Sequence, residues 1–411
     1  MKRLFITMLF APAMAFPCAA QGLSLAECRS LAHDNYPAVK RYNLIEQTRG
    51  YDVSNALKAW LPQVSVTAGA AAFSDVVAAG VPVDMENWMA GASLSISQSV
   101  YDGGQSAARR GLVNAQANVD VTQNDVTMYA VNERVESVFF GLLALEEQLG
   151  QNKLLHDDLG LHADMIRSMM RGGVANQSDL DAVRVEIVKT EQQRTVLETQ
   201  RDTYLRVLER LVGRKVSLPL QKPAMPDVEN VADAAVNRPE LAFYASQNAL
   251  LDAQRRHLDT RLRPVVSLFG MGMAHTDVTE MMRSGMVMGG LSMKWNIGAL
   301  YTRKNDLRRL EAQRAMNDSQ REVFMYNNRI QNQESSGAIA SMRRQLSMDD
   351  EIVTLRAALR KATERKVEQG TESVNELLRQ TNAVSMARQQ KALHEILLLQ
   401  EIYRKKNINN N

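Results

Sequence analysis

Two patterns of apolar and polar positions meet near residue 102. From Ala92 to Tyr101, apolar residues alternate with polar ones, most of them serine. This period of two predicts a strand with one apolar face and one serine face. Two glycines follow, and helical spacing then runs to Arg171 without a proline. A helix over 105–171 would be about 100 Å long, several times the usual length in a globular domain.

The pattern after this tall helix predicts a reversal and a return helix. Arg171-Gly-Gly173 ends the first helix, because glycine accepts the left-handed conformation of a helix cap. Asn176 or Ser178 would cap a second helix, whose apolar residues recur every three or four positions to about 212. Together the two segments predict a long antiparallel helical hairpin.

The same layout occurs twice along the chain. Gly173 and Leu180 correspond to Gly370 and Leu377 at an offset of 197 residues. Earlier in the chain, Pro37 corresponds to Pro239 at an offset of 202. A register held over such distances predicts an internal duplication.

The duplication divides the chain into two repeats and a link. We predict a first repeat at 21–213, with an N-terminal helical region, strands at about 62–73 and 90–101, and a helical hairpin at about 105–212. Three prolines mark a link at 214–236. The second repeat, 237–405, would hold a helix at about 238–261, strands at about 264–274 and 286–297, and a helical hairpin at about 301–405. We expect residues 406–411 to form a frayed tail.

The first 20 residues have the features of a secretory signal peptide. Lys2 and Arg3 precede an apolar core, and Cys18-Ala-Ala20 resembles a cleavage site. The core is too short for a membrane helix and contains two prolines. We therefore expect an exported protein in which Cys28 is the one remaining thiol.

Composition and charge exclude several classes of function. The chain is 45% hydrophobic and 23% charged, which predicts a folded protein. Its net charge of +3 is too small to indicate binding to nucleic acid. The six histidines are scattered, and the glycine pairs lack the lysine of a phosphate-binding loop. The 22 methionines would suit Cu(I), but methionine more commonly fills helix cores. We expect no enzyme, no metal site and no cofactor.

The strand pattern alone leaves two environments open. Each strand has roughly the 9–11 residues that a tilted strand needs to cross a bilayer. An ordinary hairpin with one face on a soluble core fits the same alternation.

The order of these elements resembles a known family, the TolC-like outer-membrane channels of Gram-negative bacteria. The resemblance covers 23–405. It rests on short motifs in a twofold arrangement: Leu-Ser-Leu-Ala-Glu-Cys at 23–28, Leu-Pro-Gln at 61–63, Tyr-Asp-Gly-Gly at 101–104, Gly-Gly-Val-Ala-Asn-Gln-Ser-Asp-Leu at 172–180, Trp-Asn-Ile-Gly at 295–298 and Gly-Thr-Glu-Ser-Val at 370–374.

The resemblance implies an α+β membrane protein that works as a homotrimer. Each chain would give four strands to a shared 12-stranded β-barrel in the outer-membrane lipid, and its helices to an α-helical barrel in the periplasm. Four strands cannot close a barrel alone, and an open edge in lipid leaves backbone groups unsatisfied. The apolar strand faces would meet lipid, and the lumen would be lined by Ser93, Ser95, Ser97, Ser99 and Lys294.

The implied function is a channel that exports solutes without chemistry. An inner-membrane pump would deliver the solute through a periplasmic membrane-fusion adaptor. By resemblance, the adaptor would contact the two hairpin turns, at Gly172, Gly173, Val174, Asn176, Gln177 and Ser178 and at Gly370, Thr371, Ser373 and Val374. Plain capping by glycine, which needs no partner, is the alternative at these turns.

The closed aperture of such a channel is often ringed by acids just beyond the turns. Asp179 and Glu376 match that placement, while Arg379 stands where a second acid is expected, which leaves an arginine–acid link between neighbouring helices open. Favourable charge in the first turn of a helix would equally explain both acids. Two other functions stay open, a type I protein secretion channel of the same fold and a secreted, soluble coiled-coil protein.

Overall fold

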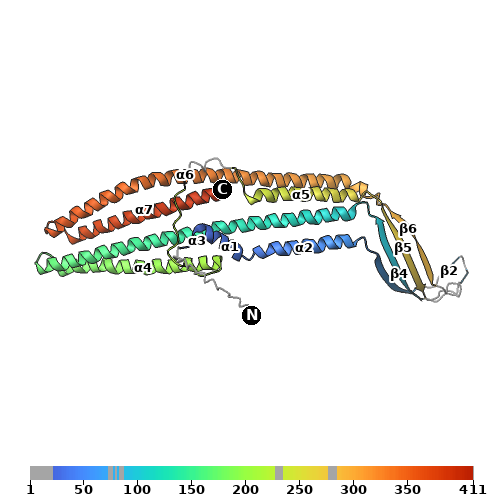
Figure 1. The fold of residues 1–411 in the computed structure, drawn as a ribbon, viewed down its shortest axis with the longest axis horizontal. Coiled ribbons are helices and arrows are strands. Elements are labelled where there is room, and N and C mark those ends of the chain that lie inside the picture. Colours follow the sequence, from blue (N-terminus) through green and yellow to red (C-terminus); the bar gives the residue numbers. More distant parts are fainter. Residues whose placement is uncertain are drawn as a thin grey trace, which may run out of the picture. The chain divides into compact units, whose positions relative to one another are not determined.

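The computed structural model describes residues 22–72, 77–78, 81–82, 88–226, 235–275 and 285–410 (Figure 1). The signal peptide predicted at 1–20 lies outside the described residues. Seven helices and four long strands follow one another in the described chain, and the order helix, two strands, two long helices occurs twice. The duplicated unit predicted from the sequence is therefore present.

The chain begins with two helices separated by a proline. Helix α1 (Leu25–Asn35) starts with a capping box, in which Ser24 and Glu27 bond to each other's backbone N–H groups. Pro37 then lies between α1 and α2 (Val39–Lys58), because proline has no N–H to continue a helix.

Four strands form one antiparallel sheet, in the order β1 (Gln63–Ala72), β4 (Trp88–Tyr101), β5 (Val265–His275) and β6 (Met286–Lys294). Two-residue strands β2 (Val77–Ala78) and β3 (Val81–Pro82) pair separately. Strand β6 ends three residues earlier than the predicted 297. The reason is that Trp295 and Asn296 already accept turn hydrogen bonds from Ile297 and Ala299, which lead into the next helix.

Helices α3 (Gln105–Arg171) and α6 (Ala299–Glu368) have 67 and 70 residues. Each reverses into a 36-residue helix, α4 (Gln177–Val212) and α7 (Val374–Asn409). Helix α5 (Pro239–Thr260) begins with proline in its first turn, where the missing N–H costs nothing. The predicted tall helical hairpins are therefore both formed.

The C-terminal residues correct the predicted tail at 406–411. Helix α7 continues to Asn409, where Ile408 and Asn409 are buried, and Asn410 ends it with a positive φ of 58°. The side-chain amides of Asn409 and Asn332 bond to each other in both directions, at 2.8 and 3.1 Å. Asn409, which the sequence placed in the frayed tail, is thus held by a partner on α6.

The described chain forms two compact units, and each takes segments from both repeats. Unit 1 contains residues up to Tyr36, Ala130–Ala235 and Gln331–Asn411; unit 2 contains Pro37–Tyr129 and Val236–Ile330. Unit 1 holds α1, α4, α7 and the distal parts of α3 and α6, whereas unit 2 holds the sheet, α2 and α5.

The hydrophobic clusters of the described residues lie in unit 1. The largest packs α1 on α3 and α4 around Phe139, Phe140 and Leu208. Cys28 is fully buried there, and burial raises the pKa of its thiol to about 11. A thiol with such a pKa stays protonated and unreactive at neutral pH, so Cys28 acts as core.

In unit 2, polar contacts join α2 to α3. The Asn124 amide donates to the carbonyl of Ala38 at 3.1 Å, and Tyr42 donates to Asp125 at 2.6 Å. These bonds hold α2 against α3 in the absence of a large apolar core.

Candidate functional site

The two hairpin turns share one backbone motif. Gly173 and Gly370 have φ angles of 75° and 70°, in the left-handed region. At the first turn, Gly173 donates to Met170 and Val174 donates to Met169. At the second, Gly370 donates to Val367 and Thr371 donates to Lys366. This pair of bonds is the Schellman motif, which explains the glycine in both turns.

The residues after each turn cap the returning helix. Asn176 caps α4, since its side chain accepts from the N–H of Asp179 and the Asp179 carboxylate accepts from the N–H of Asn176. Ser178, the other candidate cap, lies inside the helix. Ser373 caps α7 by accepting from the N–H of Glu376.

A shared apolar cluster lies beneath the two turns. Ile166, Val183 and Leu377 are fully buried in it and come from α3, α4 and α7. Val174 lies beside the second turn, because a Cβ added to Gly370 would come within 3.3 Å of its Cγ1 atom. The turns expected to act together are therefore brought together by packing.

The predicted contact residues differ in their exposure. Most of them are exposed at the two turns: Gly172, Gly173, Val174, Asn176, Gln177, Ser178, Gly370, Thr371 and Ser373. Val374 is 5% exposed and packs in the cluster beneath the turns. We correct its assignment from contact to packing, because a buried side chain offers no surface to a partner.

The three aperture candidates have local partners. The Asp179 carboxylate belongs to the capping box of α4. Glu376 accepts two hydrogen bonds from the Arg379 guanidinium, at 2.7 and 2.8 Å, and one from the amide of Gln380. The acid partner of Arg379 thus lies one turn earlier on the same helix, instead of on a neighbouring helix.

These hydrogen bonds shift the pKa values of Glu376 and Arg379. The hydrogen bonds from Arg379 and then Gln380 hold the pKa of Glu376 below its usual value. The same carboxylate raises the pKa of Arg379. Both groups stay ionised at neutral pH, so this position carries a balanced ion pair.

Behind the turns, polar contacts tie the two hairpins together. The amide of Asn382 donates to Glu186 at 3.0 Å, Arg360 donates to Asp158 at 2.8 Å, and His162 lies 3.1 Å from the Thr381 hydroxyl. His162 is buried, and burial lowers its pKa. Sequence reasoning missed these ties, because each joins residues that are far apart in the chain.

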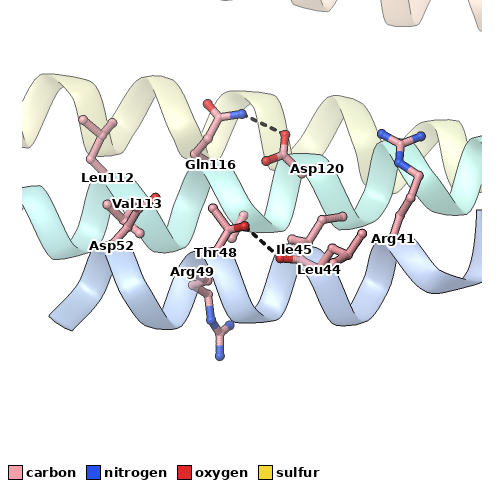
Figure 2. Close-up of a pocket in the computed structure, with 11 residues that line it drawn as sticks. Arg41, Leu44, Ile45, Thr48, Arg49, Asp52, Leu112, Val113, Gln116 and Asp120 are labelled. Carbon is pink, nitrogen blue, oxygen red and sulfur yellow. Dashed lines mark hydrogen bonds between the residues drawn. The ribbon is translucent and has the colours of Figure 1, made fainter. Parts of the chain in front are cut away.

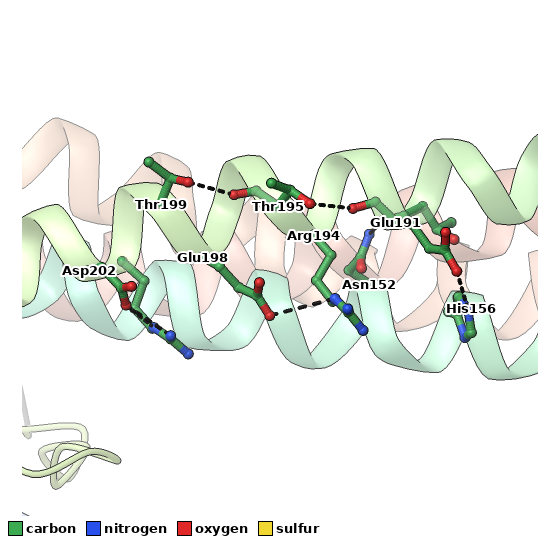
Figure 3. A network of polar contacts seen from close by, with 10 residues as sticks. Asn152, His156, Glu191, Arg194, Thr195, Glu198, Thr199 and Asp202 are labelled. Atoms are coloured by element: carbon green, nitrogen blue, oxygen red, sulfur yellow. Dashed lines mark hydrogen bonds and ion pairs between the residues drawn. The ribbon is translucent and has the colours of Figure 1, made fainter.

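A polar groove of about 640 Å³ lies between α3 and α4. Figure 3 shows His156 of α3 pointing toward Glu191 of α4, with 3.6 Å between the imidazole and the carboxylate, and Arg194 paired with Glu198. The Asn152 amide donates to the carbonyl of Thr190. The contacts of His156 and Asn152 join the two helices along this groove, whereas Arg194 and Glu198 both belong to α4.

The strand register decides which side chains share a face of the sheet. Ser65 and Ser95 are paired and bond to each other at 2.7 Å, and Ser99 is paired with Ser267. We call the side that carries these residues the serine face. It includes all the predicted lumen residues: Ser93, Ser95, Ser97, Ser99 and Lys294.

The opposite side of the sheet is apolar and exposed in this chain. Val66 is paired with Leu94, Val64 with Ile96, and Leu268 with Leu291. All six side chains are exposed. Trp60, Tyr101 and Trp295 are also exposed, near the end of the sheet that joins the helices. An apolar band flanked by aromatic residues is typical of strands that face lipid.

A groove of about 440 Å³ lies between α2 and α3 in unit 2. Figure 2 shows Leu44 and Ile45 of α2 and Leu112 and Val113 of α3 along it, with Arg41 at one end. Thr48 and Gln116, which also line the groove, bond within their own helices. The groove is therefore an apolar surface left open between paired helices.

Within the described part of the chain, no three His, Cys, Asp or Glu side chains gather where they could hold a metal ion. Among the same residues, no helix is apolar enough over a sufficient length to cross a membrane.

Comparison with known proteins gives one family match. Residues 29–214 match the family model described as outer membrane efflux protein. No curated protein matches the sequence. The match covers somewhat less than half of the chain.

The fold is similar to those of solved outer-membrane proteins. The channel OprN has a TM-score of 0.69 and 14% identity, covering 93% of this chain and 89% of its own. VceC from Vibrio cholerae has a TM-score of 0.67 and 9% identity, with 93% and 95% covered. The CmeC channel of Campylobacter jejuni has a TM-score of 0.65 and 11% identity, with 99% and 93% covered.

OprN and CmeC are described as outer-membrane channels and the family model as an efflux protein, in agreement with the prediction that the chain does no catalysis. The resemblance seen in the sequence is thus confirmed: the chain has the fold of the TolC-like outer-membrane channels, and residues 29–214 match the outer membrane efflux protein family.

Proposed function

We propose that this chain is the outer-membrane channel of an export system and works as a homotrimer. The observation that carries the proposal is the four-stranded sheet, with an exposed apolar face, a serine face, and β1 and β6 at its edges. Three copies joined edge to edge would close a barrel of about twelve strands, in which every backbone group finds a partner.

In this barrel the apolar face meets lipid and the serine face lines a water-filled lumen. The helices continue the passage into the periplasm. The long helices and their returning partners in unit 1 present two turns side by side, supported by one apolar cluster. We place the contact with a periplasmic adaptor, and through it an inner-membrane pump, at the exposed residues of these turns.

Asp179, Glu376 and Arg379 lie within the first two turns of their helices beyond the reversals. In a trimer, three copies of each would surround the passage. Because Arg379 neutralises Glu376, Asp179 would supply most of the fixed negative charge at this level. The Arg379–Glu376 ion pair therefore supports a constriction that is less acidic than one in which a second acid stands at position 379.

Membrane fractionation followed by an unboiled gel tests the channel. An outer-membrane band near three times the monomer mass is the expected result. A soluble monomer or dimer would contradict the channel and leave the secreted coiled-coil protein as the better explanation.

A matched pair of variants tests the adaptor site. Val174→Asp places a charge at the exposed turn, where the valine is 57% exposed, and Val196→Asp places one on α4, where the valine is 46% exposed. We expect Val174→Asp to abolish export while the trimer persists, and Val196→Asp to leave export intact. Normal export by Val174→Asp would overturn the adaptor assignment.

A further inference from the structure

The serine face of the sheet is not uniform along its length. Toward the helices it carries hydroxyl groups, as in the pairs Ser99–Ser267 and Ser267–Ser292. Toward the opposite end, the register pairs Met271 with Met288 and Met273 with Met286. Four thioether side chains therefore occupy consecutive positions on one face of two adjacent strands.

The geometry of a sheet brings these four side chains within reach of one another. Directly paired residues have Cβ atoms about 4.5–5.5 Å apart, and diagonal neighbours about 7–8 Å. Methionine has three rotatable bonds between its Cα and its methyl group, so the sulfur atoms can converge on one point between the strands.

The methionines are open to solution instead of filling a core. Met286 and Met288 are exposed, and Met271 and Met273 are half-buried. A hollow of about 370 Å³ adjoins Met273 on this face, and its other walls include Thr67, Gly91 and Ser93. The expectation that methionine fills helix cores does not apply to these four, since they lie on the surface of strands.

Thioether sulfur is a soft, uncharged ligand that selects monovalent copper over the harder divalent ions. We propose that Met271, Met273, Met286 and Met288 form a binding site for a soft monovalent metal ion, Cu(I) or Ag(I). The proposal that these four residues bind a metal ion depends only on the strand register. The proposal that the site lies inside an exit passage depends also on the proposed function.

Among the described side chains, the charges around the site are compatible with a cation. Lys294 also lies on the serine face, but it is six residues along β6 from Met288, about 20 Å away. The nearest neighbours across β4 are Ser93 and Ser95, which are neutral. A site made only of neutral sulfurs holds the ion without a buried carboxylate, so the ion is free to leave again.

A silver titration tests the site. Ag(I), which is stable in air, is titrated calorimetrically into the purified full-length protein in detergent and chloride-free buffer. We expect the native protein to show a saturable binding event that is lost when all four methionines are changed to leucine. The control is Met293→Leu, because Met293 is exposed on the opposite face of β6 and its loss should leave binding unchanged.

Retention of the binding event by the four-leucine variant would overturn the proposal. So would a native protein that takes up an apolar dye at this face and no silver, because the methionines would then serve as an adaptable apolar lining. A failure of export with silver binding intact would count against the proposed function and leave the metal site standing.

A second measurement needs no variant. Peroxide converts exposed methionine to its sulfoxide, and a sulfur bound to silver is protected. Peptide mass spectrometry of the native protein should show slower oxidation of the four methionines when silver is present, with Met293 and Met316 unaffected. Equal oxidation rates with and without silver at all these positions would refute the site.

Discussion

The two compact units differ in where their apolar side chains lie. In unit 1, Phe139, Ile166 and Leu377 are fully buried in clusters that join several helices. In unit 2, Leu94 and Leu291 of the sheet are 48% and 67% exposed, and α2 and α3 leave an apolar groove open.

This difference shows that the two units of the chain are stabilised in different ways. Burial of apolar surface stabilises a fold by roughly 25 cal/mol per Å², and unit 1 gains this within a single chain. Unit 2 leaves such surface uncovered, so its stability depends on what lies outside the chain. Lipid on the apolar face and further copies at the strand edges would supply that cover in the proposed trimer.

The sharpest test of unit 1 is Leu377→Ala. Leu377 is fully buried beneath both turns, so its truncation should cost about 2–5 kcal/mol through lost burial and a cavity. Met386→Ala is the control on the same helix, because Met386 is exposed and should cost less than about 0.5 kcal/mol. Denaturant unfolding followed by circular dichroism measures both. Equal effects would mean that the cluster is not a core.

The corresponding test of unit 2 is Leu94→Arg. On a face in contact with lipid, arginine near the middle of the membrane costs about 2–4 kcal/mol. The control is Ser97→Arg, on the serine face of the same strand, where water would solvate the charge. The yield of trimer on an unboiled gel is expected to fall for Leu94→Arg only. Similar yields for the two variants would remove the distinction between the faces.

The two hairpin turns should differ in how much an alanine substitution at the glycine lowers stability, which is a smaller effect. Alanine in the left-handed conformation costs about 1–2 kcal/mol, at Gly173 as at Gly370. Gly370→Ala should cost more, since its new Cβ lies 3.3 Å from Val174, whereas a Cβ at Gly173 meets no neighbour within 4 Å. Thermal unfolding of both variants, and of Gly370→Ala combined with Val174→Ala, measures the difference. The excess cost should disappear in the combined variant, and its persistence would place the strain elsewhere.

The smallest effect concerns the pH dependence of Glu376. Its pKa is lowered in the folded chain, so its contribution to stability is present above the unfolded pKa and is lost as pH falls through the folded pKa. Arg379→Ala should raise the pKa of Glu376 toward its ordinary value, as measured by NMR titration of the carboxylate. Arg184→Ala, which removes a partner of Asp181, should leave that pKa unchanged. If Arg379→Ala has no effect, the pair observed here does not exist in solution.

Local patterns were enough to predict most of the elements and both turns. Gly173 and Gly370 could be placed because a left-handed cap needs glycine whatever surrounds it. The cap formed by Ser24 and Glu27 is local in the same way, since its bonds join residues three apart. The alternation in β4 predicted its two faces, because the period of a strand is a property of its backbone.

Predictions that depended on distant neighbours were less complete. Val374 begins α7 as Gln177 begins α4, yet Gln177 is exposed and Val374 is buried, because its depth is decided by helices that come from the other hairpin. Asn409 looked like part of a tail until its amide was seen to pair with Asn332. Arg379 could be placed on its helix, but the identity of its acid partner required the side-chain positions.

The sequence by itself determined the duplicated order of elements, the length of the helices and the reversal points, because each follows from the period or conformation of a short segment. Only the tertiary structure decided which strands are neighbours and therefore which side chains share a face. The register places Met271 and Met273 beside Ser95 and Ser93, on the serine face. Pairing between strands depends on backbone hydrogen bonds across some 180 residues of chain, and no local pattern encodes that alignment.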